Sequence, residues 1–180
     1  GLRDTAVHTV EVGAVNDGPD AVDDVDVTEE DTPIVVNLLA NDSDPDSDPI
    51  TVTEIGGISV TPGTAVPVSN GVATLLASGQ IRFAPDANFA GTTAFTYTVN
   101  DPSGATTTAS VSVAVSGVND APVAADDTAL TNEDSPVAFD VTTNDSDPDG
   151  DSLAVSSVDG IAITTGQTVP VANGQVTLLA

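Results

Sequence analysis

The chain has 180 residues, which is enough for one or two domains with an apolar core. It has 28 Asp and Glu residues against two Arg and no Lys, for a formal net charge of −26. This charge argues against nucleic acid or an anionic membrane as a partner, because both need a basic surface. Cysteine is absent, so disulfides and thiolate metal sites are excluded, and the single histidine, His8, excludes a multi-histidine metal site.

The apolar composition favours strands over disorder. Hydrophobic residues make up 39% of the chain, and short runs rich in Val, Ile and Thr recur along it. The N-terminus does not resemble a signal peptide, and no apolar run reaches the roughly 18 residues that a membrane-spanning helix needs. We therefore expect this segment to be soluble and not inserted in a membrane.

An internal repeat organises the sequence. Val-Asn-Asp-Gly-Pro at residues 15–19 returns as Val-Asn-Asp-Ala-Pro at residues 118–122, an offset of 103, and this register holds without a gap to residue 180. Repeats of domain length are typical of tandem arrays. The repeat predicts three parts: residues 1–17 as the last strand of a preceding repeat and a linker, residues 18–117 as a complete repeat, and residues 118–180 as an incomplete second repeat.

Within the complete repeat, short β-branched and aromatic runs alternate with turn residues, as in an all-β sandwich. The predicted strands, in chain order, are residues 21–27, 34–38, 50–55, 65–68, 72–76, 81–83, 93–99 and 106–115. We predict tandem Greek-key β-sandwich domains of about 103 residues per repeat, and helix signals are almost missing.

Two local features refine this prediction. Asn70-Gly71 lies between two strand-like runs and returns as Asn173-Gly174. This dipeptide predicts a hairpin with a type I′ turn, because both central residues of that turn need a positive φ. The aromatic residues of the repeat are expected to cluster in the core rather than to bind a ligand; they are Phe83, Phe89, Phe95 and Tyr97.

An acidic loop occurs in both copies. It reads Asn-Asp-Ser-Asp-Pro-Asp-Ser-Asp at residues 41–48 and Asn-Asp-Ser-Asp-Pro-Asp-Gly-Asp at residues 144–151. So many carboxylates repel one another unless water, salt or a cation intervenes. Oxygen ligands on a short, kinked backbone suit a hard cation such as Ca²⁺, whereas the alternative is a solvated acidic turn.

The predicted topology gathers further acids around this loop. In a Greek-key sandwich the junction at Asn16-Asp17, the acidic loop and the turn after the strand at residues 93–99 can share one pole. That pole would then hold Asp17, Asp44, Asp46, Asp48 and Asp101, enough oxygens for one or more Ca²⁺ ions. Glu30 follows the first strand, so we expect it at the opposite pole, facing Asn119, Asp120 and the acidic loop of the next copy.

These motifs together resemble the cadherin-like tandem repeats of very large secreted bacterial adhesins. The residues that show the likeness are VNDGP and VNDAP at the junctions, the EDTP and EDSP turns, the two acidic loops and TYTVNDPSG before the last strand. The resemblance implies a Greek-key sandwich with Ca²⁺ bound between successive repeats. The ligands it implies are Asn16, Asp17, Glu30, Asp44, Asp46, Asp48, Asp101, Asn119, Asp120, Glu133, Asp147, Asp149 and Asp151.

The sequence departs from the cadherin pattern at the linker. The acid that precedes the Asn-Asp pair in cadherins is Ala14 or Gly117 here, and the linker is one residue shorter before its proline. We therefore expect one or two ions per junction rather than three. An EF-hand is rejected because its twelfth position is Ser156 and no helix flanks the loop.

The function that follows is non-enzymatic. We expect a Ca²⁺-binding extender repeat of an extracellular or cell-surface adhesin, with neighbouring repeats of the same chain as partners. Two alternatives stay open: a self-associating subunit of a filament or biofilm matrix, and an accessory carbohydrate-binding module of an extracellular enzyme. A glycosidase pair of carboxylates is disfavoured, because the acids cluster on turns without an evident cleft.

Overall fold

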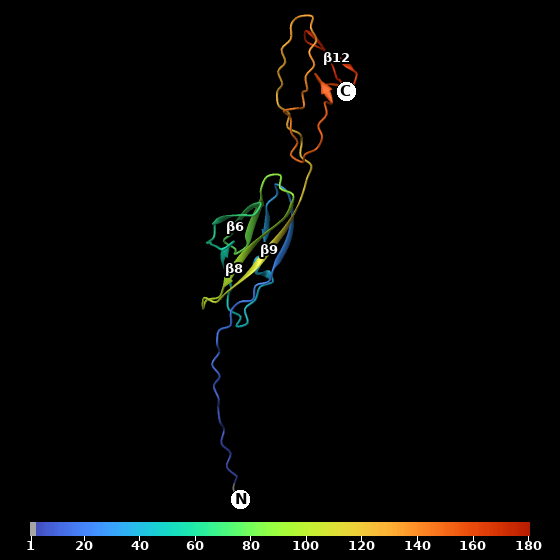
Figure 1. The fold of residues 1–180 in the computed structure, drawn as a ribbon. Coiled ribbons are helices and arrows are strands. Elements are labelled where there is room, and N and C mark those ends of the chain that lie inside the picture. Colours follow the sequence, from blue (N-terminus) through green and yellow to red (C-terminus); the bar gives the residue numbers. More distant parts are fainter. Residues whose placement is uncertain (1–2) are drawn as a thin grey trace. The chain divides into compact units, whose positions relative to one another are not determined.

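The computed structural model describes residues 3–180 (Figure 1). These residues divide into two compact units, of which unit 1 ends at Gly117 and unit 2 begins at Val118. Residues 3–19 contain no strand or helix. Residues 3–18 are exposed, whereas Pro19 is buried. The prediction that residues 1–17 form the last strand of a preceding repeat thus stays a prediction, and residues 1 and 2 lie outside the described residues.

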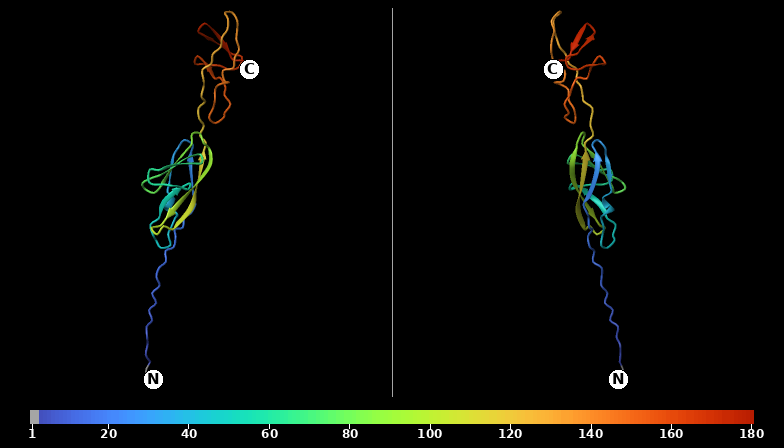
Figure 2. Two further views of the ribbon diagram at one scale, coloured as in Figure 1. Left: turned by 60° about the vertical axis from the view of Figure 1, so that its left-hand side comes forward. Right: turned by 90° about the vertical axis from the view of Figure 1, so that its right-hand side faces the viewer.

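Unit 1 is an all-β sandwich of two sheets. Its strands are β1 (Asp24–Glu29), β2 (Ile34–Val36), β3 (Thr51–Ile55), β4 (Ile58–Ser59), β5 (Ala65–Val68), β6 (Gly71–Leu75), β7 (Ile81–Pro85), β8 (Gly91–Asn100) and β9 (Thr106–Ser116). One sheet has the order β1-β9-β8-β3-β4 and the other β2-β7-β6-β5. Figure 2 shows the ribbon of this unit in two further views. β1 runs parallel to β9, and every other pair within these two sheets is antiparallel.

The core lies between the two sheets because alternate residues of each strand point inward. Phe95, Tyr97 and Val99 of β8 are buried, and so are Val111, Val113 and Val115 of β9. Phe83 of β7 stacks on Phe95 of the other sheet, with ring centroids 5.8 Å apart. The expected aromatic core is confirmed: Phe89 is only partly buried but packs against the same cluster.

The predicted strands lie close to the observed ones, most with bounds that differ by one or two residues, and three differences are larger or of another kind. β1 begins at Asp24 rather than at residue 21. β2 ends at Val36, and the chain then forms a short 3₁₀ helix, η1 (Leu38–Ala40), whose Leu38 is buried. The two-residue strand β4 was not predicted, because Gly56-Gly57 ahead of it indicated only a turn.

The hairpin between β5 and β6 exists, but the predicted turn is wrong by one residue. Val68 pairs with Gly71, so the central residues are Ser69 and Asn70, and only Asn70 has a positive φ, of 55°. Gly71 is instead the first residue of β6. A Cβ on it would lie 2.7 Å from Phe83 Cε2 and would also overlap the carbonyl oxygen of Ala84. The glycine is thus required for close packing rather than for the turn.

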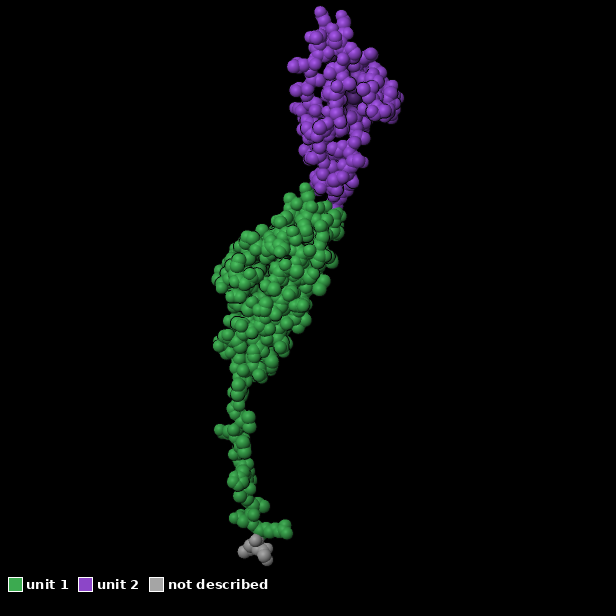
Figure 3. Space-filling model, in the orientation of Figure 1, with its two compact units in different colours: residues 1–117 green, residues 118–180 purple. Residues whose placement is uncertain are grey.

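Unit 2, which is coloured purple in Figure 3, contains only short strands. These are β10 (Ser157–Val158), β11 (Ile161–Ala162), β12 (Thr168–Val171) and β13 (Gly174–Thr177), which form two separate two-stranded sheets, β10-β11 and β12-β13. In the repeat register, β12 and β13 are the counterparts of β5 and β6. This hairpin persists because both of its strands lie within the 180 residues.

Candidate functional site

Strand pairing brings three distant segments to one pole of unit 1. Asn100 at the end of β8 pairs with Thr51 at the start of β3 and with Thr106 at the start of β9. The acidic loop, residues 41–48, leads into β3, and Asp101 follows β8 directly. The linker joins them there, since Asn16 Nδ2 donates a 2.7 Å hydrogen bond to Asp101 Oδ2. We call this end of unit 1 the acidic pole.

The acidic loop has a defined shape of its own. Asp44 Oδ1 accepts hydrogen bonds from the backbone N–H groups of Asp46, at 2.9 Å, and Asp48, at 3.2 Å. Asp46 Oδ2 in turn accepts a 2.7 Å hydrogen bond from the backbone N–H of Asp17. Asp44 Oδ2 is buried and has no hydrogen-bond partner among the described residues. A buried carboxylate oxygen without a donor is unfavourable unless a cation or water reaches it.

Asp101 is the most enclosed acid of this pole, with 2% of its surface exposed. Besides Asn16, it accepts hydrogen bonds from Ser103 Oγ and from the backbone N–H of Ala105. These donors, the Asn16 amide first, hold the pKa of the Asp101 carboxyl below its ordinary value. Asp101 is therefore ionised at neutral pH.

The second copy reproduces the linker geometry within unit 2. Asn119 Nδ2 donates to the carbonyl oxygen of Asp120 at 2.8 Å, as Asn16 does to Asp17 at 2.9 Å. The backbone N–H of Asp120 donates to Asp149 Oδ2 at 2.7 Å.

The acidic loop of the second copy also has the shape of the first. Asp147 Oδ1 accepts from the backbone N–H groups of Asp149, at 3.0 Å, and Asp151, at 3.3 Å. The same bonds thus form at the same positions of both repeats, although Ser47 is replaced by Gly150.

Of the two glutamates of the predicted site, Glu30 lies apart from the acidic pole of its unit. Glu30 follows β1 at the end of unit 1 opposite Asp101, because β1 runs parallel to β9 and Glu29 pairs with Ser116. It is 5% exposed, and its Oε1 would lie 3.7 Å from a Cβ on Gly117. Glu133 is exposed in unit 2. Glu30 therefore lies at the opposite pole of unit 1, as the sequence predicts, whereas its approach to Asn119, Asp120 and the acidic loop of the next copy stays a prediction.

The arrangement stops short of a formed metal cluster. Across residues 3–180, no three acidic or histidine side chains converge closely enough to enclose an ion as they stand. Asp46 and Asp101 each have one oxygen engaged by a linker N–H group. A cation would have to draw these carboxylates together around Asp44 Oδ2.

Sequence reasoning missed a second group of acids beside this pole. Tyr97 is fully buried, and its hydroxyl lies 3.1 Å from the carbonyl oxygen of Val22 and from both carboxylate oxygens of Asp42. Burial, followed by the nearby charge of Asp42, raises the pKa of the Asp24 carboxyl on β1, whose Oδ2 has no hydrogen-bond partner among the described residues. The sequence does contain a signal that could have identified this group, because Asp24 and Asp42 return as Asp127 and Asp145 in the second repeat.

A Greek-key sandwich with acidic turns at one pole, repeated at an offset of 103 residues, defines an immunoglobulin-like tandem repeat. The family model of the bacterial Ig domain matches residues 16–114 and again residues 119–180. The chain therefore belongs to the bacterial Ig domain family. The match is to this family rather than to cadherin repeats, so cadherin-like calcium binding and adhesion stay predictions.

Other comparisons add little. The search of curated proteins found no match. One similar solved structure is a nucleoside hydrolase-related hypothetical protein from Saccharophagus degradans that is associated with carbohydrate metabolism. It is 17% identical, with a TM-score of 0.39, and the match covers 56% of this chain and 26% of that chain. A likeness at this level supports no argument about function.

The family indicates where proteins of this kind are located. Bacterial Ig domains are typically extracellular. Among the described residues, no helix is long and apolar enough to cross a bilayer.

Proposed function

We propose that this chain is a calcium-binding extender segment of a large extracellular adhesin. The observation that supports this best is Asp44 Oδ2, a buried carboxylate oxygen without a donor, in a loop held against the linker by the Asp17–Asp46 hydrogen bond. The recurrence of the linker and loop geometry at Asp120, Asp147 and Asp149 indicates a property of the repeat rather than of one loop.

The donor set fits Ca²⁺. This ion takes six to eight oxygen ligands, from carboxylates and backbone or amide carbonyls, in a flexible geometry. The first junction offers Asn16, Asp17, Asp44, Asp46, Asp48 and Asp101. The second offers Asn119, Asp120, Asp147, Asp149 and Asp151. Glu30 and Glu133 match the glutamate that a preceding repeat supplies in cadherin-like arrays.

The mechanism would be electrostatic. Two carboxylates 4 Å apart repel by about 1 kcal/mol in water and by about 4 kcal/mol at an effective dielectric constant of 20. Without a cation this repulsion loosens the loops and the linker. With Ca²⁺ the same carboxylates become ligands of one ion, which limits the movement of the linker and stiffens the array of repeats.

The test compares the 180-residue chain in Ca²⁺, in Mg²⁺ and in chelator. We expect Ca²⁺ to raise the thermal midpoint and to change the radius of gyration measured by X-ray scattering, with a Kd of about 10⁻⁴ to 10⁻³ M as in extracellular modules. Asp44→Asn should weaken binding at least about tenfold, which corresponds to about 1.4 kcal/mol. Asp31→Asn, an exposed acid in the turn after β1, is the matched control. If neither midpoint nor dimensions respond to Ca²⁺, the proposal is wrong.

Self-association is the second candidate function. β1 is an edge strand of its sheet, and its Val25 and Val27 are 81% and 68% exposed, whereas Asp24 and Asp26 of the same strand are half-buried. An edge strand with solvent-facing valines is a template for pairing with another chain. Electron microscopy separates the two functions, because self-association predicts bundled fibres and the extender predicts single rods.

A carbohydrate-binding module has no comparable support. Such sites usually present exposed aromatic rings, whereas Phe83, Phe95 and Tyr97 of unit 1 are buried in the core. The absence of enzymatic activity stays a prediction from the sequence.

A further inference from the structure

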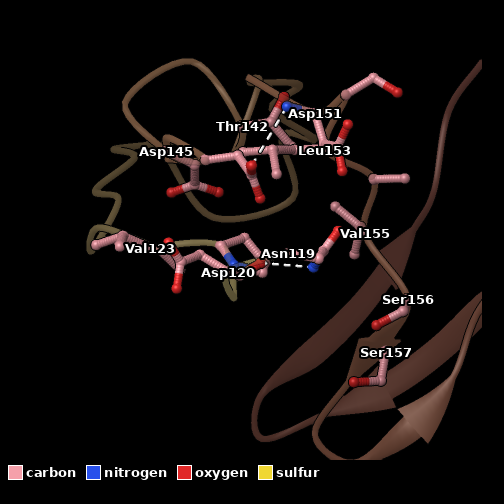
Figure 4. Close-up of a pocket in the computed structure, with 15 residues that line it drawn as sticks. Asn119, Asp120, Val123, Thr142, Asp145, Asp151, Leu153, Val155, Ser156 and Ser157 are labelled. Atoms are coloured by element: carbon pink, nitrogen blue, oxygen red, sulfur yellow. Dashed lines mark hydrogen bonds between the residues drawn. The ribbon is translucent and has the colours of Figure 1, made fainter. Parts of the chain in front are cut away.

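Local hydrogen bonds attach the acidic loop of unit 1 to the segment that precedes β1. The backbone N–H of Val22 donates to Asp42 Oδ1 at 2.8 Å, and Asn41 Nδ2 donates to the carbonyl oxygen of Val22 at 3.1 Å. In the second copy the backbone N–H of Ala125 donates to Asp145 Oδ1, also at 2.8 Å. Figure 4 draws Asp145 together with side chains of the linker and the acidic loop of that copy. Both backbone bonds join residues 20 positions apart, so they fix the loop locally but not against the later strands.

The candidate calcium ligands of unit 1 come from two segments that are far apart in the sequence. Asp44 and Asp46 belong to the acidic loop, whereas Asp101 directly follows β8. One ion can use both segments only if the loop is held at a fixed position against the end of β8. The contacts between the loop and this strand are therefore part of the site.

Two contacts hold the acidic loop against β8, one on each side of the ligands. After the loop, Thr51 pairs with Asn100, and Thr51 Oγ1 donates to Asn100 Oδ1 at 2.5 Å. At the start of the loop, the Tyr97 hydroxyl lies 3.1 Å from both carboxylate oxygens of Asp42. Tyr97 and Asn100 are both on β8, so the two contacts together set the loop against Asp101.

The Tyr97 hydroxyl is a donor in a fixed place, because its ring is fully buried in the core. Burial, followed by the charges of Asp24 and Asp42, raises the pKa of this hydroxyl, so it keeps its proton at neutral pH. A hydroxyl has one proton to donate, and the carbonyl oxygen of Val22 already accepts from Asn41. The Asp42 carboxylate is the stronger acceptor of the two, since a hydrogen bond to a charged group is about twice as strong as a neutral one.

We propose that Tyr97 is a positioning residue of the calcium site: its hydroxyl, through Asp42, sets the acidic loop against Asp101. This inference rests on the proposed function, because it concerns the same site. Tyr97 itself contacts no ion in this arrangement and acts only through Asp42. Loss of a hydrogen bond that orients metal ligands typically lowers metal affinity by about 10- to 100-fold.

The experiment compares Tyr97→Phe, which keeps the ring in the core, with Thr93→Val as the matched control. Thr93 is buried on the same strand, and its hydroxyl donates to the carbonyl oxygen of Ser69 at 2.5 Å. Both variants lose one buried hydroxyl bond, but only Tyr97 contacts the acidic loop. All chains carry Asp147→Asn to weaken binding at the second copy. We expect calorimetry to give a Kd for Ca²⁺ at least about tenfold higher in Tyr97→Phe and an unchanged Kd in Thr93→Val.

A double-mutant cycle separates positioning from a general loss of stability. Asp101→Asn removes the ligand against which the loop is set. In that background Tyr97→Phe should therefore change the Kd by less than about twofold. A residue that only stabilises the fold would instead weaken binding equally with and without Asp101.

Amide hydrogen exchange in chelator tests the contact without calcium. Tyr97→Phe should speed exchange at Val22, whose N–H donates to Asp42, and at Ser43, whose N–H donates to the carbonyl oxygen of Asp20. If the native chain binds no Ca²⁺, the proposed function fails, and exchange at these amides still decides whether Tyr97 holds the loop. The positioning role is overturned by unchanged exchange at both amides, by an unchanged Kd in Tyr97→Phe, or by equal effects in the two backgrounds of the cycle.

Discussion

At the scale of single residues, the acids of unit 1 differ in what surrounds them. Asp101 is enclosed by donors, and its pKa is lowered by the Asn16 amide and then by the donors of its own turn. Asp24 is half-buried without a donor for Oδ2, and its pKa is raised by burial. One carboxylate is thus stabilised in its charged form and the other is destabilised. The two should respond to pH in opposite ways.

Asp24 gives a prediction with a definite sign. Because the pKa of Asp24 is raised in the folded state, ionisation of its carboxyl opposes folding. The resulting loss of stability is absent below the ordinary pKa of 3.8 and develops as pH rises through the pKa of the folded state. Asp24→Asn should therefore raise the free energy of unfolding at pH 7 by about 0.5–1 kcal/mol. Denaturant unfolding at pH 7 and pH 3 checks this, since the gain should shrink at pH 3.

Asp26→Asn is the control for that experiment, because it removes one negative charge from the same face of the same strand. An equal gain in both variants would show that net charge, and not the site around Tyr97, causes the effect.

Asp101 gives the opposite dependence. Because the pKa of Asp101 is lowered in the folded state, its ionised carboxyl stabilises the fold. This stabilisation is present above the ordinary pKa of 3.8 and is lost as pH falls through the pKa of the folded state. Asp101→Asn should lower the thermal midpoint at pH 7 in chelator, and the difference from the native chain should close in strong acid. A midpoint difference that persists unchanged to pH 2 would contradict this reading.

At the scale of elements, the β5–β6 hairpin and its counterpart β12–β13 share a sequence pattern but not a packing environment. Gly71 lies against Phe83 and the backbone of β7, whereas nothing lies within 4 Å of a Cβ built on Gly174. The difference arises because β7 has no counterpart within the 180 residues. Similar local sequences thus meet different steric limits in the two copies.

This contrast predicts different outcomes for the same substitution. Gly71→Ala should destabilise unit 1 by about 1–3 kcal/mol, since the new methyl group overlaps the core. Gly174→Ala should change the free energy of unfolding by no more than about 0.5 kcal/mol. Chemical denaturation followed by the fluorescence of Tyr97 checks the value for unit 1, and denaturation followed by circular dichroism, which reports on the strands of both units, checks the value for Gly174→Ala. Equal effects of the two substitutions would show that the turn, and not the packing, requires glycine.

At the scale of the whole chain, the net charge of −26 acts on every fold element at once. Self-repulsion of this size destabilises compact states, and dissolved salt screens it over about 10 Å at 0.1 M and about 3 Å at 1 M. At a given ionic strength, screening does not depend on which cation is present. Binding of a cation at the acidic loops does depend on which cation it is.

Salt and calcium should therefore be separable. We expect 1 M NaCl to raise the thermal midpoint of the 180-residue chain moderately, and millimolar Ca²⁺ to raise it further at constant ionic strength. The Ca²⁺ increment should be lost in a chain with both Asp44→Asn and Asp147→Asn, while the NaCl increment is kept. If NaCl alone reproduces the calcium effect, the acidic loops are solvated turns.

Sequence by itself determined the repeat, its register, the all-β class and most strands, because these depend on local patterns of period two and on turn residues. It also identified the acidic loops and placed Glu30 at the far end of its repeat from Asp101. The close packing of Gly71 against Phe83, a residue of a later strand, was decided by the tertiary structure. The Asp24–Asp42–Tyr97 group and the bond between Asn16 and Asp101, 85 residues apart, were likewise set only by tertiary structure. Such contacts depend on how the sheets pack, which local patterns do not encode.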